Sequence, residues 1–116
     1  MKHIKKGRKF HRKKGQREAL LKSLGENLIL RESIITTNEK AKELRGFLEK
    51  KITFAKKGGV LALRELQKYF SKKASQKLVK EISQTLMDRK GGYTRIIKIG
   101  PRAKDNVKMV KIEILK

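Results

Sequence analysis

The 116-residue sequence contains no cysteine and no tryptophan, and it has few acidic residues. Without cysteine the chain can form neither a disulfide framework nor a thiolate metal site, which is compatible with a reducing cytoplasm. Its only histidines, His3 and His11, have no carboxylates near them in the sequence, so a zinc site or an acid–base pair has no candidate cluster. No apolar run approaches the ~20 residues that span a bilayer. We therefore expect no catalysis, no metal, no cofactor, no small-molecule substrate and no membrane.

Positive charge dominates the composition of the chain. The chain carries 33 Lys and Arg residues against 11 Asp and Glu, a formal net charge of +22. Self-repulsion at this level destabilises a compact state unless a polyanion is bound. Lys far outnumbers Arg, and Lys contacts phosphate as a flexible point charge, which favours binding to a nucleic-acid backbone over reading of base edges.

The cations are densest at the N-terminus, where no acidic residue precedes Glu18. This stretch has too little apolar surface to order itself, so we expect residues 1–15 to form a basic extension and residues 16–116 a single globular domain. Counterion release makes nucleic acid its natural partner. The candidate contacts in this arm are Lys2, Lys5, Lys6, Arg8, Lys9, Phe10, Arg12, Lys13, Lys14 and Arg17.

Other interpretations of a basic arm are a solvated tail, a membrane-surface anchor or a targeting peptide. A secretory signal needs an apolar region of 7–15 residues, and a membrane-binding helix needs an apolar face, whereas this arm has a lone Phe10. Phe10 is a candidate for stacking on an unpaired base, with anchoring of the arm on the core as an equal alternative.

Hydrophobic spacing predicts the folded elements. In the first half we expect a helix over 16–30, in which Gly25 allows a bend or an early end, a strand over Ser33–Thr37, and a long helix that ends at Gly58–Gly59. Its N-terminus is capped either by Thr36 in a capping box with Glu39 or by Thr37.

In the second half, shorter helices are predicted over Val60–Phe70 and Ser75–Met87, with a break at Ser71–Lys73. Two strands follow, Tyr93–Ile99 and Val107–Leu115, joined by the loop Gly100–Asn106 into an antiparallel hairpin. The whole is a two-layer α+β fold: a basic arm, then α-β-α-α-α-β-β, with helices packed on one face of a three-stranded mixed sheet.

Further candidate contacts lie in the hairpin. Tyr93 beside Arg95 is a candidate for base stacking, although ordinary packing of Tyr93 is slightly favoured. Arg102 and Lys104 lie in the hairpin loop, where nucleic-acid contact is weighed against simple solvation.

Several segments together resemble the bacterial large-subunit ribosomal protein L17 family. They are the opening Met1-Lys2-His3 with Gly7-Arg8, then Ile35-Thr36-Thr37, Lys40-Ala41-Lys42-Glu43-Leu44-Arg45, Ile52-Thr53-Phe54-Ala55-Lys56 and, most specifically, Gly91-Gly92-Tyr93-Thr94-Arg95-Ile96-Ile97-Lys98. The resemblance covers essentially the whole chain. It implies an α+β fold, and it adds His3 and Thr94 to the candidate RNA contacts, beside Tyr93, Arg95 and Arg102.

The same resemblance implies a structural constituent of the large subunit in the cytoplasm. Such a protein binds the large-subunit rRNA and neighbouring ribosomal proteins, on the solvent side near the exit of the peptide tunnel. Two rivals stay open from the residues alone: a nucleoid-type DNA-binding protein, and a small enzyme acting on RNA. The second needs a carboxylate or histidine cluster that the sequence does not show.

Overall fold

The computed structural model describes residues 14–102 and 106–115. Helices and strands follow in the order α1 (Lys14–Arg31), β1 (Ser33–Thr37), α2 (Asn38–Ala55), α3 (Gly59–Leu66), α4 (Lys72–Lys77), the π-helical turn η1 (Leu78–Ile82), α5 (Ser83–Thr85), β2 (Thr94–Pro101) and β3 (Lys108–Ile114). The last three helical segments run on without a gap and form one helix. The predicted α+β class and the predicted order of helices and strands are confirmed.

The three strands form one sheet in the order β1-β3-β2, and both pairs are antiparallel. The expected mixed sheet is therefore wrong. Strands β1 and β2 do run in the same direction, but the C-terminal strand β3 inserts between them and hydrogen-bonds to both. Lys111 of β3 accordingly faces Ile35 on one side and Ile97 on the other.

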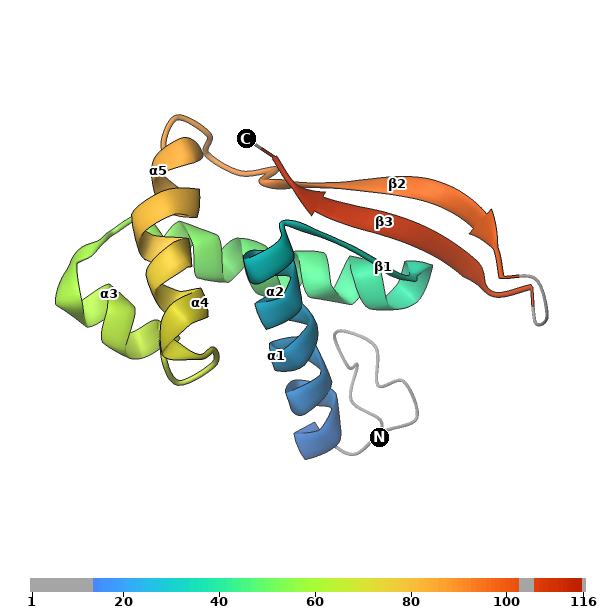
Figure 1. The fold of residues 1–116 in the computed structure, drawn as a ribbon, viewed down its shortest axis with the longest axis horizontal. Helices are drawn as coiled ribbons and strands as arrows, with labels where there is room; N and C mark the ends of the chain where they lie inside the picture. Colours follow the sequence, from blue (N-terminus) through green and yellow to red (C-terminus); the bar gives the residue numbers. More distant parts are fainter. Residues whose placement is uncertain (1–13, 103–105, 116) are drawn as a thin grey trace, which may run out of the picture.

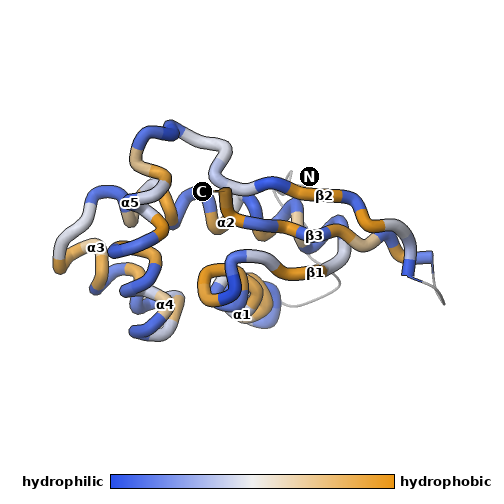
Figure 2. The backbone as a smooth tube through the Cα atoms, turned by 45° about the horizontal axis from the view of Figure 1, so that its top comes forward, coloured by the Kyte–Doolittle hydropathy of each residue, from blue (hydrophilic) through white to orange (hydrophobic). Residues whose placement is uncertain are grey.

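The sheet is covered on one face only, as predicted (Figure 1). Val110, Ile112 and Ile114 of β3 are buried, α2 packs against all three strands, and α1 packs against β1 and β3. The opposite face is open, and Ile35 and Ile97 there remain 65% and 41% exposed. In Figure 2 hydrophobic and hydrophilic residues alternate along the second half of β3, whereas β1 and β2 each carry two adjacent isoleucines.

Helix α2 is central to the fold, because it contacts all three strands as well as α1, α3, η1 and α5. The hydroxyl of Thr37 accepts a hydrogen bond from the backbone N–H of Lys40 at 3.3 Å, so Thr37 is the N-cap rather than Thr36. The predicted apolar stripe is completely buried; it comprises Ala41, Leu44, Leu48, Ile52 and Ala55. The helix ends at Ala55, and Gly58, with φ of +68°, turns the chain into α3.

Helix α1 passes through Gly25 without a break, contrary to the bend or early end that this glycine allowed. The reason lies in the packing. Gly25 is buried, and a Cβ added there would lie 3.0 Å from Cε1 of Phe70 and 3.5 Å from Cε2 of Phe47. The missing side chain therefore lets the Phe70 ring approach the α1 backbone closely, which offsets part of glycine's cost in a helix.

A second contact joins α1 to the residue that precedes α4. The carboxylate of Glu26 accepts a hydrogen bond from the backbone N–H of Ser71 at 2.7 Å. The hydroxyl of Ser71 in turn accepts from the N–H of Ala74 at 3.2 Å and caps α4. Ser71 thus marks the predicted break between the two shorter helices.

Two glycines in helix interiors test the packing explanation. Gly46→Ala in α2 meets nothing within 4 Å, so it should raise the free energy of unfolding by about 0.5–1 kcal/mol through helix propensity. Gly25→Ala should gain less than Gly46→Ala, or lose stability, because its methyl group meets Phe70. Urea unfolding of both variants measures the difference. Equal gains would show that the Phe70 ring moves aside freely and that the close approach is unimportant.

Candidate nucleic-acid interface

Most of the predicted arm contacts, and one loop contact, lie outside the described residues. They are Lys2, His3, Lys5, Lys6, Arg8, Lys9, Phe10, Arg12, Lys13 and Lys104. The described structure instead shows where the chain enters the folded body, and what surrounds the other predicted contacts.

The described end of the basic segment is the first turn of α1. Lys14 is exposed and Arg17 is half-buried. Leu28 and Ile29, near the other end of α1, are completely buried. The helix is therefore anchored in the core by its C-terminal half, and its first turn lies away from the sheet (Figure 1).

Tyr93 is an interior residue and not an exposed stacking platform. Only 1% of its surface is accessible. Its hydroxyl accepts a hydrogen bond from the Thr53 hydroxyl at 3.2 Å and another from the Lys56 ammonium at 3.1 Å. These bonds, Thr53 first and then Lys56, hold the pKa of the Tyr93 phenol below its ordinary value against the opposing effect of burial. Base stacking by Tyr93 is thus ruled out in this conformation, and the alternative of internal packing is what the structure shows.

Thr94 is also turned inward. It is 6% exposed, and its hydroxyl donates a hydrogen bond to a carboxylate oxygen of Glu49 on α2 at 3.1 Å. The Thr94 side chain therefore holds the start of β2 against α2 and is not presented to a ligand, contrary to its expected place among the RNA contacts.

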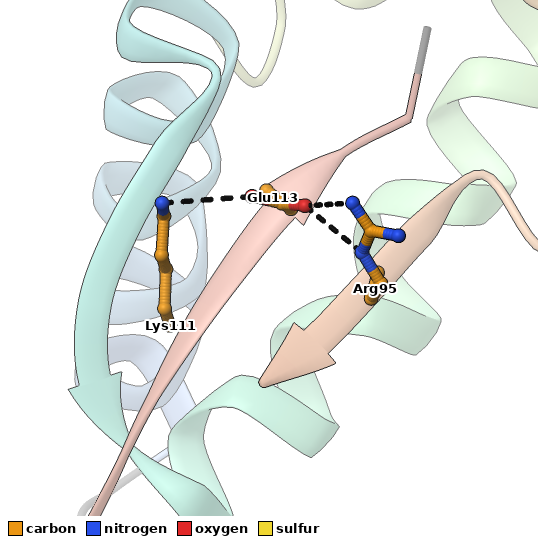
Figure 3. Close-up of polar contacts among 3 residues, drawn as sticks. All are labelled: Arg95, Lys111 and Glu113. Carbon is orange, nitrogen blue, oxygen red and sulfur yellow. Dashed lines mark hydrogen bonds and ion pairs between the residues drawn. The ribbon is translucent and has the colours of Figure 1, made fainter. Parts of the chain in front are cut away.

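Arg95 points to the open face of the sheet, where it meets Glu113 (Figure 3). Its Nε and Nη2 both donate to Glu113 Oε2, at 2.9 and 2.5 Å, and the Lys111 ammonium lies 3.7 Å from Glu113 Oε1. The hydrogen bond from Arg95, more than any other effect, holds the pKa of the Glu113 carboxyl below its usual value. The Arg95 side chain is still 59% exposed, so its cation remains accessible.

Arg102 is exposed at the tip of the hairpin. Its backbone closes the loop, because its N–H donates to the Val107 carbonyl at 2.7 Å and its carbonyl accepts from the N–H of Asn106 at 3.1 Å. About seven residues of strand separate Arg102 from Arg95, roughly 23 Å at the usual rise. The predicted contacts on β2, at the tip and on α1 therefore lie at three separate places (Figure 1).

The fold brings Arg95 together with two arginines that the sequence did not single out. Arg31 at the end of α1, Arg89 after α5 and Arg95 on β2 all line one groove of about 560 Å³. Arg31 and Arg89 are exposed. Arg31 lies far from Arg89 and Arg95 in the chain, and the pairing of β1 and β2 with β3 brings them together. Of the two added arginines, only Arg89 has a sequence signal, because it lies in the basic stretch before Gly91-Gly92.

Residues 14–102 and 106–115 contain neither a candidate membrane span nor a cluster of metal ligands. No helix there is long and apolar enough to cross a bilayer. Nor do three or more His, Cys, Asp or Glu side chains gather in that part of the chain in a way that would hold a metal ion.

Comparison with known proteins gives one consistent result. The family model for ribosomal protein L17 matches residues 20–115. The chain is 42% identical to the large ribosomal subunit protein bL17 of an Exiguobacterium species, covering 92% of this chain and 97% of the relative. It is 44% identical to bL17 of Erythrobacter litoralis (99% of this chain, 83% of the relative) and 43% identical to bL17 of Desulfotalea psychrophila (99% and 90%).

These likenesses identify the class first: the chain is a ribosomal protein, a structural component and not an enzyme. Since the family model covers most of its length and the relatives exceed 40% identity, the chain belongs to the ribosomal protein L17 family. The resemblance read from the sequence is confirmed.

The buried position of Tyr93 makes a testable prediction. Tyr93→Phe keeps the ring and removes the hydroxyl that Thr53 and Lys56 bond, so the free energy of unfolding should fall by about 1 kcal/mol. Affinity for rRNA should not change. Tyr69→Phe is the control, because no described residue bonds the Tyr69 hydroxyl, and it should be nearly neutral. Weaker rRNA binding by well-folded Tyr93→Phe would contradict the internal role.

The Arg95–Glu113 pair predicts a pH dependence. A carboxyl whose pKa is lowered by folding contributes stability above its unfolded pKa of about 4.3, and that contribution is lost as pH falls through the lower folded pKa. Arg95→Gln should move the Glu113 pKa up towards its ordinary value, as measured by NMR titration of the side-chain carboxyl. Lys108→Gln, an exposed change on the same strand, should leave it in place. An unchanged Glu113 pKa in Arg95→Gln would show that the pair is not formed in solution.

Proposed function

We propose that the chain is a structural constituent of the bacterial large ribosomal subunit that binds and stabilises large-subunit rRNA. The observation that carries the proposal is a net charge of +22, concentrated at the N-terminus, in a member of the L17 family. Packing rRNA brings phosphates together, and their mutual repulsion has to be neutralised. A chain whose cations outnumber its acids threefold supplies that neutralisation, with release of condensed counterions.

The basic arm and the folded body have different tasks. The folded body fixes the position of α1, the helix that follows the arm. It does so through the buried residues Leu28 and Ile29 and through the hydrogen bond from the Ser71 N–H to Glu26. The arm makes the phosphate contacts, through Lys2, Lys5, Lys6, Arg8, Lys9, Arg12, Lys13, Lys14 and Arg17, with His3 and Phe10 beside them. Contacts of this kind position the protein on its RNA, while shape, 2′-hydroxyls and unpaired bases supply specificity.

The body contributes its own cations. Arg95 on the open face and Arg102 at the hairpin tip are both exposed, and Lys104 lies in the same loop of the sequence. Because these places are well separated on the molecule, they suit an RNA surface that passes around the domain rather than one small ligand.

Location and partners follow from the family. The relatives carry the name of a large ribosomal subunit protein. By analogy, the chain acts in the cytoplasm as part of the ribosome, with large-subunit rRNA and neighbouring ribosomal proteins as its partners. The family resemblance further suggests a place on the solvent side, near the exit of the peptide tunnel.

Removing the arm tests the proposal. Deletion of residues 2–13 leaves α1 intact, so the thermal unfolding of the body should be preserved. Affinity for purified large-subunit rRNA at 0.1 M salt should fall roughly 10- to 100-fold, and the salt dependence should become shallower by about 0.7–0.9 per lost phosphate contact. Filter binding across a salt series measures both quantities.

Two comparisons make the result specific. A full-length variant with glutamine in place of Lys5, Lys6, Lys9 and Lys13 should weaken binding in the same direction while keeping the length of the chain. Duplex DNA of equal length is the competing ligand. Binding to DNA as tight as to rRNA at high salt would favour a nucleoid-type protein and overturn the proposal, as would a deletion that leaves rRNA affinity unchanged.

A further inference from the structure

A groove forms where three separate parts of the chain meet near the end of the sheet. Its walls are the junction of α1 and β1, the segment between α5 and β2, and the last residues of β3, which lie together near the C-terminal end of β3 in Figure 1. Its volume is about 560 Å³, which is in the range of pockets that hold nucleotide-sized groups. The lining is mainly polar, with Ile114 and Leu115 as its apolar part.

Three arginines line this groove: Arg31, Arg89 and Arg95. Among the described residues none forms a hydrogen bond or ion pair with the side chains of Arg31 or Arg89, and both residues are exposed. Arg95 directs two N–H groups to a single oxygen of Glu113. A guanidinium has five N–H donors, so Arg95 keeps others for a further ligand.

The acidic residues of the groove are already neutralised by cations. Glu113 is paired with Arg95 and lies 3.7 Å from Lys111, and Glu32 is paired with Lys77 at 3.0 Å. Neither Lys111 nor Lys77 is part of the lining. The two carboxylates therefore do not offset Arg31 and Arg89, and the groove presents a positive potential.

Hydrogen bonds hold the backbone on both sides of the groove, close to each of the three arginines. Glu32 takes a left-handed conformation with φ of +68°, which ends α1 beside Arg31, and its carbonyl accepts from the N–H of Ile114 at 3.0 Å. On the other side the N–H of Leu115 donates to the Tyr93 carbonyl at 2.9 Å, and the Lys56 ammonium donates to the carbonyl of Arg89. Little ordering of the backbone is therefore required when a ligand binds.

We propose that this groove, through Arg31, Arg89 and Arg95, is a second binding site for the phosphodiester backbone of rRNA, separate from the basic arm. Guanidinium groups match phosphate oxygens with paired N–H donors, and three of them in one open polar groove fit successive charges along a strand. The inference rests on the proposed function and deepens it, because it places part of the body's RNA contact in one defined groove. It adds Arg31 and Arg89 to the RNA-contacting residues.

The test compares two double variants of the full-length chain. Arg31→Gln with Arg89→Gln removes the two unpaired charges of the groove. Arg45→Gln with Arg64→Gln removes two exposed arginines on α2 and α3, outside the groove, and is the matched control. Affinity for purified large-subunit rRNA is measured over a salt series. For the groove variant we expect a roughly tenfold loss at 0.1 M salt and a slope shallower by about 1.4–1.8, the value for two phosphate contacts. The control should lose less than threefold.

The outcomes separate this inference from the function on which it rests. If wild type fails to bind rRNA, the proposed function itself fails. If wild type binds, the arm deletion weakens binding and the groove variant equals its control, only the groove is overturned. Arg31→Lys with Arg89→Lys keeps both charges and should keep the wild-type slope. If the double glutamine variant does not fold, the single variants Arg31→Gln and Arg89→Gln, each at an exposed side chain, answer the question. Each should make the slope shallower by about 0.7–0.9, and a wild-type slope in both overturns the groove.

A last arm of the experiment distinguishes RNA backbone from a free anion. Inorganic phosphate and chloride are compared as competitors at equal ionic strength, and the Nε–Hε NMR signals of the three arginines are followed. Signals that shift on addition of rRNA fragments, with phosphate no more effective than chloride, support the proposal. Saturation of the same signals by millimolar phosphate would assign the groove to a small anion and overturn it.

Discussion

Pairing of the C-terminal strand β3 on both of its edges is the interaction on which this structure depends. One set of its side chains, Val110, Ile112 and Ile114, supplies the apolar face that α2 and α1 cover, and the other set forms the middle of the open face. A hairpin of β2 and β3 alone is marginal in water. Adding β1 as the third strand joins residues almost eighty positions apart, and it brings the end of α1 next to the end of the sheet.

This arrangement also solves an electrostatic problem. A chain of 116 residues with a net charge of +22 has few acidic residues available for internal ion pairs and hydrogen bonds. The fold uses several of them where elements join: Glu26 binds the backbone before α4, Glu49 binds Thr94, Glu32 pairs with Lys77 and Glu113 pairs with Arg95. Most other cations are left at the surface, where a polyanion can reach them, and Arg95 is both paired with Glu113 and largely exposed.

Particular residues show how far prediction from the sequence reached. The strand Ser33–Thr37, the stripe of α2 and the alternation of β3 were all predicted correctly, because each is a local period that repeats over several residues. Gly25 and Tyr93 were left open, since a bend at Gly25 was allowed and packing of Tyr93 was only slightly favoured over stacking. A glycine in a helix allows a bend, and a tyrosine beside an arginine suggests stacking, until the Phe70 ring and the Thr53 and Lys56 side chains are known to occupy the adjoining space.

The order of amino acids alone was enough to establish the fold class, the elements, the excess of positive charge and the family, since all of these are properties of composition, short-range periodicity or continuous motifs. The direction of strand pairing, the burial of Tyr93 and Thr94, and the meeting of Arg31, Arg89 and Arg95 in one groove became evident only in three dimensions. Each of these depends on which distant segments come into contact. That choice is made by the joint packing of helices and sheet, and no local pattern encodes it.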